Sequence, residues 1–242
     1  MSRLRRCGGR QLGIGFHRNA ADCYHVRMNF NPTPILQAAN LHAQQMAAQA
    51  MLEGRLVAFP TDTVYGIGTA YDNIIGIARI FASKGRTGEK AIPILIATLE
   101  QLDALTERLP GGAVALANYF WPGALTLILA RRSGVPQELA PGRTTIGVRM
   151  PAHELTRDLI AVTGRPLACS SANLSGASPA LSAAQVAAYF PVGLDFILDG
   201  GTTAIGTPST VVDFTTPARP RLLREGAISR AALATVLGAS LA

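Results

Sequence analysis

The chain has 242 residues, of which 48% are hydrophobic and 15% charged, so it is long and apolar enough to bury a core and is not an intrinsically disordered chain. Lys and Arg total 22 against 15 Asp and Glu, a formal charge of +7, which favours polyanionic partners such as RNA, nucleotides or phosphates. Three widely spaced Cys exclude a disulfide scaffold and a CxxC zinc site, and they indicate a reduced, cytoplasmic protein.

Most of the positive charge lies at the start of the chain. Residues 1–28 hold six Arg and one acid, a net charge of +5, and show neither helical nor strand periodicity. They contain no apolar stretch of the length that a secretory signal needs, and they hold little Ser for an organelle transit peptide. We therefore expect 1–28 to be a disordered N-terminal extension, or sequence upstream of a misassigned start codon with Met28 as the natural start.

From Pro34 the sequence alternates between helix-like and strand-like segments. Apolar residues spaced by three and four predict helices, and short apolar runs bounded by Gly, Pro or polar residues predict buried strands. In chain order, the pattern predicts a helix at 34–53, a strand at 56–60, a loop at 60–68, a helix at 73–83, a strand at 92–97, helices at 99–109 and 111–120, strands at 124–130 and 145–149, a helix at 153–163, a strand at 166–170, a helix at 182–190, strands at 196–199, 209–214 and 221–224, and a helix at about 229–238.

This alternation is typical of an α/β chain that folds as one compact domain. The run 109–130 carries no charge and has the length of a membrane span. The sequence Trp121-Pro122-Gly123 interrupts it, so a buried helix, a turn and a buried strand describe it better. We expect no membrane association.

The usual catalytic signatures are missing from the sequence. It contains no GxxxxGK[ST], no HExxH, no GxSxG and no Cys–His cluster, and GIGTAY at 66–71 lacks the third Gly of a dinucleotide fingerprint. Mechanisms that depend on a nucleophilic side chain or on a protein metal site therefore have little support, and we assign no metal ligands.

Polar clusters do occur at the ends of the predicted strands, where open α/β sheets bind ligands. They are PTDTVYG (60–66), KGR (84–86), TIGVR (145–149), SSANLSG (170–176), TPSTVVD (207–213) and LLREG (222–226). The two Lys of the chain, Lys84 and Lys90, lie within seven residues of each other. Lys is a compact point charge suited to phosphates, and clustered cations and hydroxyls favour binding of phosphates and carboxylates.

Each cluster also has a purely structural interpretation. Lys84 and Arg86 fit the C-terminus of a helix, and Ser171 and Asn173 fit a turn. Cys169 sits in an apolar strand and is expected to be packed rather than reactive. Structural roles also suit Asp62, Arg149, His153, Ser170, Ser209, Thr210 and Asp213.

The combination is more specific than its parts. In order, GRLVAFPTDTVYGIG, KGR, WPGALTLIL, TIGVRMP, SSANLSG and DGG…STVVD closely resemble the YrdC-type threonylcarbamoyl-AMP synthase family, in its short single-domain form. The resemblance covers about 34–238, which we take as the catalytic domain. It implies a single-domain α/β fold, with a twisted, open, mixed sheet flanked by helices and a deep basic groove.

The resemblance also implies a reaction. Members of the family combine L-threonine, bicarbonate and ATP into L-threonylcarbamoyladenylate and pyrophosphate, the first step of threonylcarbamoyladenosine formation in tRNA. ATP is a substrate, and Mg²⁺ is expected to bind with the nucleotide. A threonylcarbamoyl transferase complex acts downstream on tRNA. Weak binding of tRNA or double-stranded RNA is compatible with the enzyme, which we expect in the cytoplasm.

The site residues are carried over motif by motif. The family's catalytic Lys-Arg-Ser-Asn tetrad, assigned to ATP and the reacting carbamate, corresponds to Lys84, Arg86, Ser171 and Asn173. Positions assigned to threonine correspond to Thr63, Tyr65, Arg149 and Ser209, with Thr61 as further groove wall. Additional ATP contacts correspond to Lys90, Thr145 and Arg224.

The sequence departs from the family pattern at a few positions. Thr87 replaces a Pro, Lys90-Ala91-Ile92 replaces Asn-Pro-Leu, Leu95 replaces a His, and Glu225 replaces a Pro. These differences affect details of nucleotide and threonine contact. Lys90 is expected either to take the place of the Asn as a phosphate contact or to be only an exposed surface residue.

Three other functions are weighed against this one. A carbamoyl-transfer module of hydrogenase maturation predicts acylphosphatase and Cys-rich zinc segments, which the sequence lacks. A non-catalytic RNA-binding or ribosome-maturation protein predicts interleaved basic and aromatic residues, but aromatics are only 6% of the chain. A phosphosugar lyase needs acidic metal ligands near its phosphate site, whereas the clusters here are rich in hydroxyls and cations.

Overall fold

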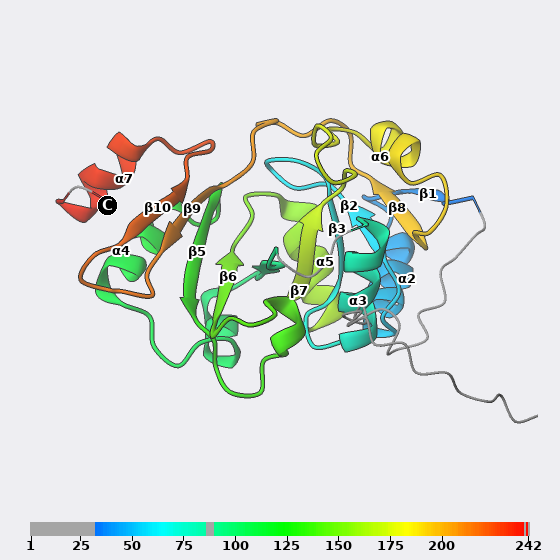
Figure 1. Ribbon diagram of the computed structural model, residues 1–242. Coiled ribbons are helices and arrows are strands. Elements are labelled where there is room, and N and C mark those ends of the chain that lie inside the picture. The colour runs from blue at the N-terminus through cyan, green and yellow to red at the C-terminus, as the bar shows by residue number, and fades with distance from the viewer. Residues whose placement is uncertain (1–31, 86–89, 240, 242) are drawn as a thin grey trace, which may run out of the picture.

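A mixed ten-stranded sheet runs through the protein, which the computed structural model describes over residues 32–85, 90–239 and 241 (Figure 1). The spatial order is β1-β8-β2-β3-β7-β4-β6-β5-β9-β10, which leaves β1 and β10 at the edges of an open sheet. The strands are β1 (Ile35–Gln37), β2 (Val57–Phe59), β3 (Gly66–Ala70), β4 (Ile94–Leu95), β5 (Leu125–Ala130), β6 (Thr145–Arg149), β7 (Leu167–Ser171), β8 (Phe196–Asp199), β9 (Thr210–Asp213) and β10 (Arg221–Arg224).

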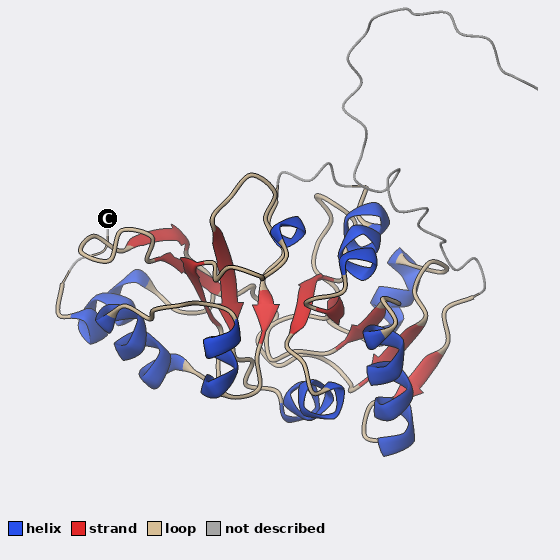
Figure 2. Cartoon of the chain, turned by 90° about the horizontal axis from the view of Figure 1, so that it is seen from below, coloured by secondary structure: helices blue, strands red, loops and turns tan. Residues whose placement is uncertain are grey.

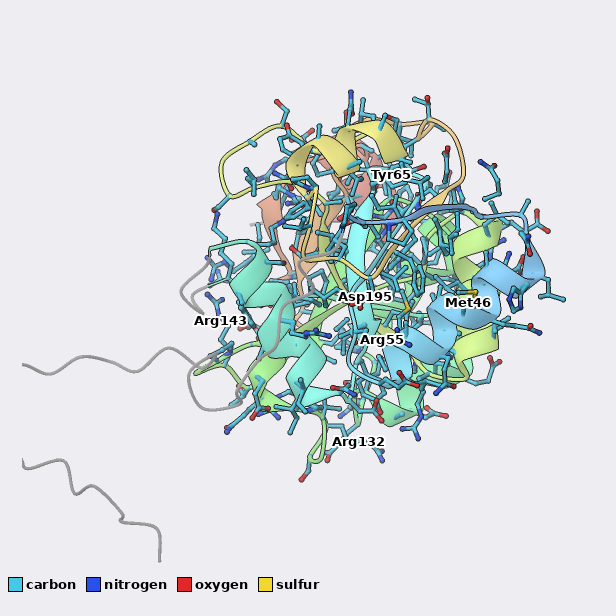
Figure 3. All side chains as sticks on the ribbon, turned by 90° about the vertical axis from the view of Figure 1, so that its right-hand side faces the viewer. Met46, Arg55, Tyr65, Arg132, Arg143 and Asp195 are labelled. Carbon is cyan, nitrogen blue, oxygen red and sulfur yellow. The ribbon has the colours of Figure 1, made fainter. Side chains whose placement is uncertain are left out.

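Helices flank this sheet on both sides (Figure 2). Residues of α3, α4, α6 and α7 join the larger hydrophobic core, and residues of α2 and α5 join a smaller core. Figure 3 labels Met46 on α2, at the outer side of that smaller core. The α-helices are α2 (Leu41–Leu52), α3 (Ile74–Ser83), α4 (Gly111–Phe120), α5 (Glu154–Thr163), α6 (Ala183–Tyr189) and α7 (Arg230–Leu237), with 3₁₀ turns η1 (Leu99–Ala104) and η2 (Gln137–Leu139).

The alternation of side chains along the central strands separates the two cores. Ile94 and Ala168 point into the larger core, whereas their neighbours Leu95, Leu167 and Cys169 belong to the smaller one. Each fully buried Ile or Leu contributes about 1.5–3 kcal/mol of transfer free energy, so the interior strands are fixed in register. Residues of the smaller-core face of β4 and β7 therefore have defined positions.

The predicted fold class is confirmed as a mixed α/β sheet that is open and flanked by helices. The predicted helices at 73–83, 111–120, 153–163, 182–190 and 229–238 correspond to α3, α4, α5, α6 and α7 within one residue at each end. Among the described residues, every helix falls short of the length and hydrophobicity that crossing a bilayer requires.

The prediction of one helix over 34–53 is wrong at its start. Residues Ile35–Gln37 form strand β1, which pairs in parallel with β8. The helix α2 begins only after Asn40, whose side-chain oxygen accepts hydrogen bonds from the backbone N–H groups of His42 (2.9 Å) and Ala43 (3.3 Å). The segment as a whole is rich in helix-forming residues, so its composition does not show that the helix begins only at the N-cap Asn40.

The prediction of a loop over 60–68 is wrong at its end. Gly66–Ala70 forms β3, a buried strand between β2 and β7. The two glycines look like turn residues in the sequence, but they are needed for close packing. A Cβ on Gly66 would lie 2.4 Å from Cys169 Sγ, and one on Gly68 would lie 2.7 Å from the carbonyl oxygen of Ala168. Glycine here marks close backbone approach rather than a turn.

Two further predicted elements are shorter than expected. The predicted strand at 92–97 is reduced to Ile94–Leu95 in β4, and the predicted helix at 99–109 is the 3₁₀ turn Leu99–Ala104. The 3₁₀ turn has no side-chain cap at Thr98, and 3₁₀ helices are rarely long because their hydrogen bonds are poorly aligned.

Candidate functional site

A pocket of about 290 Å³ lies on the sheet face that carries Leu95 and Cys169. Its walls come from the loop before β3, from β3, β4, β5, β6, β7 and β10, and from the loops before β4, after β7 and before β9. Its described lining comprises Thr61, Thr63, Val64, Tyr65, Gly66, Lys90, Ala91, Pro93, Leu95, Thr126, Arg149, Cys169, Ser170, Ser171, Pro179, Pro208, Ser209 and Arg224. Three of these residues are cationic and none is acidic, so the described wall favours anionic ligands.

The register of the sheet gives the pocket two ends. Leu95 pairs with Arg149 of β6 on one side and with Leu167 of β7 on the other. Ser171 lies four residues beyond Leu167 along the same strand, which corresponds to about 13 Å. Arg149 and Ser171 therefore occupy opposite ends of the pocket.

The Ser171 end is built around the side chain of Lys84, which follows the last residue of α3 and is 3% exposed. Its Nζ donates to the Ser171 carbonyl, to Ser171 Oγ at 3.3 Å and to Asn173 Oδ1 at 3.3 Å. Asn173 is held in turn by its Nδ2, which donates to the carbonyls of Leu174 (3.0 Å) and Ala177 (2.6 Å). The ammonium group of Lys84 is thus fixed next to the hydroxyl of Ser171.

Three of the four residues predicted as the catalytic tetrad therefore meet at one place. The fourth, Arg86, lies outside the described residues. Lys90 is exposed and lines the pocket. Thr145 is the first residue of β6 and lies four residues before Arg149, so the parallel pairing of β6 with β4 places it towards the Ser171 end, although it does not line the pocket itself.

The opposite end is built around Arg149, which is 6% exposed. Its Nη1 donates to Thr63 Oγ1 at 2.8 Å, and its Nε donates to the carbonyl of Gly123 at 3.0 Å. Its Nη2 forms an ion pair with Oδ1 of Asp62 at 2.5 Å, and Asp62 is likewise 6% exposed. The guanidinium is therefore held in one orientation at the wall of the pocket.

A tight turn presents Asp62 and Thr63 to this guanidinium. Thr61 Oγ1 lies 3.0 Å from Thr63 Oγ1 and donates to the carbonyl of Val64 at 2.6 Å. It also accepts from the backbone N–H groups of Thr63 and Val64, each at 3.2 Å. Side-chain hydrogen bonds of this kind fix a short turn locally.

Ser209, the residue before β9, completes the Arg149 end. Its hydroxyl lies 2.8 Å from Thr126 Oγ1, and its carbonyl accepts from Arg224 Nε (3.0 Å) and Nη2 (2.8 Å). Burial, and then the charge of Arg149, lower the pKa of Arg224. Arg224, predicted from the sequence as an ATP contact, thus lies at the same end of the pocket as the predicted threonine contacts.

Gly226 supports the backbone of this wall. A Cβ at this position would lie 2.2 Å from the Pro208 carbonyl oxygen and 2.7 Å from the Ser209 carbonyl carbon. We expect Gly226→Ala to lower the free energy of unfolding by about 1–3 kcal/mol, because backbone atoms must move to make room. Urea denaturation measures this loss.

The matched control is Gly111→Ala at the start of α4, where an added Cβ meets nothing within 4 Å. This control is expected to keep its full stability. Equal unfolding free energies for Gly226→Ala and the wild-type protein would contradict the packing argument.

Tyr65 is predicted from the sequence as a threonine contact, but in the structure its hydroxyl is hydrogen-bonded to other groups of the protein. Its side chain is fully buried, and its hydroxyl donates to the carbonyl of Gly201 at 2.8 Å and accepts from the N–H of Gly200 at 3.2 Å. Figure 3 labels it beside α6, consistent with its backbone N–H donating to the carbonyl of Ala180. Burial raises the pKa of Tyr65, so its hydroxyl stays protonated.

Cys169 and His153 also behave as the sequence suggests. Burial raises the pKa of the Cys169 thiol to about 12, so it is not a thiolate nucleophile at neutral pH. His153 is half-buried and precedes α5, with its Nδ1 3.2 Å from Thr156 Oγ1. Burial lowers the pKa of His153 against the opposing charge of Asp62.

The structure adds residues that the sequence did not assign to the site. Thr126 lies under Ser209, Gly226 leaves room for the Ser209 backbone, and Asp62 pairs with Arg149. Asp62 lies between Thr61 and Thr63 in a polar cluster, which was the one sign in the sequence that it belongs to the site. Its pairing with Arg149 could not be foreseen, because Arg149 is distant in the sequence. Within the described parts of the chain, no group of three or more His, Cys, Asp or Glu is arranged to hold a metal ion.

The chain is similar to known proteins in sequence and in fold. The family model Sua5_yciO_yrdC, described as "Telomere recombination", matches residues 49–226. The chain is 44% identical to a threonylcarbamoyl-AMP synthase of Pyrococcus abyssi over 80% of this chain and 57% of that protein. It is 40% identical to a threonylcarbamoyl-AMP synthase of Bacillus subtilis over 79% of this chain and 56% of that protein.

A solved structure is similar as well. The crystal structure of P. abyssi Sua5 complexed with L-threonine superposes with a TM-score of 0.81 at 40% identity, over 88% of this chain and 62% of that chain. The chain therefore spans less than two thirds of the length of each of these three proteins.

Proposed function

Because the chain belongs to the Sua5–YciO–YrdC family, we propose that it is a threonylcarbamoyl-AMP synthase. It converts L-threonine, bicarbonate and ATP into L-threonylcarbamoyladenylate and pyrophosphate. Relatives that share 40% or more of their aligned residues with it carry this name, and one similar structure was solved with L-threonine.

The two ends of the pocket are the observation that carries the proposal. The product joins an amino acid carboxylate at one end to an adenylate phosphate at the other. Arg149 with Thr63 offers a planar, hydrogen-bonding cation for the carboxylate. Lys84 behind Ser171, about 13 Å away by strand geometry, offers a point charge for the phosphate.

The chemistry requires two bonds to form in sequence. Bicarbonate first loses hydroxide, which leaves as water once protonated, to give carbon dioxide. The threonine nitrogen then attacks the carbon of carbon dioxide, loses a proton and becomes a carbamate. A carbamate oxygen then attacks the α-phosphorus of ATP, and pyrophosphate leaves. Since two anions must approach each other, fixed cations and oriented hydrogen-bond donors lower the barrier more than acid–base groups do.

The residue roles follow this division of the pocket. We assign Lys84, Arg86, Ser171 and Asn173 to the triphosphate and the reacting carbamate, with Lys90 and Thr145 as further nucleotide contacts. We assign Thr63, Arg149 and Ser209 to threonine, with Tyr65 as a wall. We keep Arg224 as an ATP contact that reaches the nucleotide from the threonine end of the pocket, where it lies beside Ser209.

Mg²⁺ would enter this site with ATP. The described lining offers hydroxyl oxygens but no carboxylate, and the Asp62 carboxylate nearby is paired with Arg149. The donor set thus fits a metal held mainly by the phosphates, with Ser171 and neighbouring hydroxyls at hand. Bound there, Mg²⁺ would neutralise phosphate charge.

The cellular role follows from the product. We propose that a threonylcarbamoyl transferase complex passes the group to tRNA, that the enzyme works in the cytoplasm, and that residues 34–238 form the catalytic domain. The predicted extension 1–28 lies outside the described residues. Weak tRNA or double-stranded RNA binding remains part of this proposal.

The proposal is tested by pyrophosphate release. The protein should release pyrophosphate from ATP only when both L-threonine and bicarbonate are present. Reactions that lack one of the two are the controls. Pyrophosphate release that does not depend on threonine, or none from folded protein, would contradict the proposed function.

A further inference from the structure

Asp62 is a buried acid whose two oxygens have different surroundings. Its Oδ1 contacts Arg149 Nη2 at 2.5 Å, whereas its Oδ2 is buried and has no hydrogen-bond partner among the described residues. Asp62 itself does not line the pocket. Its carboxylate therefore acts on a ligand only through the guanidinium of Arg149.

The contacts of Arg149 are distributed one to each nitrogen. Nε donates to Gly123, Nη1 to Thr63 and Nη2 to Asp62. A guanidinium carries five N–H groups, so within the described structure each terminal nitrogen keeps a second N–H. Two such donors match the two oxygens of a carboxylate.

The backbone around Asp62 is fixed from both sides. Its carbonyl accepts from the N–H of Ile205 at 3.1 Å, and the carbonyl of Thr63 accepts from the N–H of Gly206 at 2.9 Å. Thr61 closes the turn, as described above. A rigid turn therefore holds Asp62 against the side chain of Arg149. Without this contact, the long Arg149 side chain would have several rotamers available.

The protein groups at this end of the pocket carry a net positive charge. Arg149 and Arg224 are cations, Asp62 is the acid paired with Arg149, and His153 is the other titratable group that interacts with Asp62. With its lowered pKa, His153 is neutral at neutral pH. One net positive charge then remains for a ligand with a single carboxylate.

We propose that Asp62 is a positioning residue that orients Arg149 for the carboxylate of the amino acid substrate. This inference rests on the proposed function. The proposal predicts a selective effect of replacing Asp62. Binding of the substrate carboxylate should weaken, whereas binding of ATP at the Ser171 end should stay intact.

The test compares Asp62→Ala and Asp62→Asn with the wild-type protein on L-threonine and on L-threoninamide, which has no carboxylate charge. For Asp62→Ala we expect the KM for threonine to rise about tenfold, as for loss of a charge-assisted contact, with an ATP KM close to that of the wild type. The preference for threonine over threoninamide in kcat/KM should fall by about the same factor. Asp62→Asn keeps an acceptor oxygen and should lie between the two.

The control is Thr163→Ala in α5, which removes another buried side-chain hydrogen bond, from Thr163 Oγ1 to the carbonyl of Leu159 at 2.7 Å. A purely structural effect lowers the fraction of folded enzyme and leaves the substrate preference unchanged, as this control should. If Asp62→Ala does not fold, Asp62→Asn carries the comparison.

The outcomes separate the two hypotheses. Wild-type activity on threonine together with an unchanged threonine preference in the folded Asp62 variants would overturn the role of Asp62 and leave the proposed function standing. No threonine-dependent activity in the wild-type protein would overturn the proposed function, and this inference with it.

Discussion

Lys84→Ala is expected to lower kcat/KM by roughly 30- to 1,000-fold, equivalent to about 2–4 kcal/mol of barrier, because a fixed cation at the site of developing charge is lost. Lys84 is 3% exposed and its Nζ contacts Ser171 and Asn173, so no solvent ion can replace it with the same geometry. Steady-state pyrophosphate release measures the effect. We expect Arg86→Ala to act in the same direction.

The substitution also leaves buried acceptors on Ser171 and Asn173 without their donor, at about 1–3 kcal/mol of stability. A thermal melt shows whether the variant still folds. Arg219→Ala, which removes an exposed cation in the turn between β9 and β10, is the control and should keep the wild-type rate. A Lys84→Ala protein that folds and works at nearly the wild-type rate would show that the nucleotide end of the pocket is misplaced.

Arg149→Ala is expected to have the largest effect on stability, about 3–5 kcal/mol, because it leaves the carboxylate of Asp62 buried without a counter-charge. Urea denaturation gives this value. The same variant should lose saturable threonine binding, which calorimetric titration with L-threonine measures.

The variant Arg149→Lys shows whether the positive charge at this position is enough or whether the planar guanidinium is needed. It keeps the positive charge but cannot contact Thr63, Asp62 and Gly123 together, as the planar guanidinium does. We expect its KM for threonine to rise by about tenfold or more, with a smaller loss of stability than in Arg149→Ala. The matched control is Arg79→Lys, which alters another largely buried cation, 3.9 Å from Asp195. An Arg79→Lys protein with the same rise in threonine KM would mean that the effect is not local.

Much of the fold was predictable from the sequence because the apolar periodicities are strong. The helix α3 and the strand β6 were placed correctly, since spacing and burial agree there. Strand β3 was not, because Gly66 and Gly68 serve tertiary packing against Cys169 and Phe59, and a single sequence does not show what a glycine packs against.

The sequence was enough to predict which residues belong to the candidate site, but not how they contact one another. Motif order brought Lys84, Ser171 and Asn173 into one group, and the structure places them within hydrogen-bonding distance. The pairing of Asp62 with Arg149 depends on the tight turn before β3 meeting the end of β6. Such contacts between distant segments depend on strand order and register, which local patterns do not specify.

Identification of the product tests the proposed reaction. Purified protein is incubated with ATP, L-threonine and isotopically labelled bicarbonate, and the adenylates are separated and weighed by mass spectrometry. We expect threonylcarbamoyladenylate that carries the label in its carbamoyl carbon. Folded protein that consumes ATP but forms no labelled adenylate, or that forms none at all, would contradict the proposed reaction.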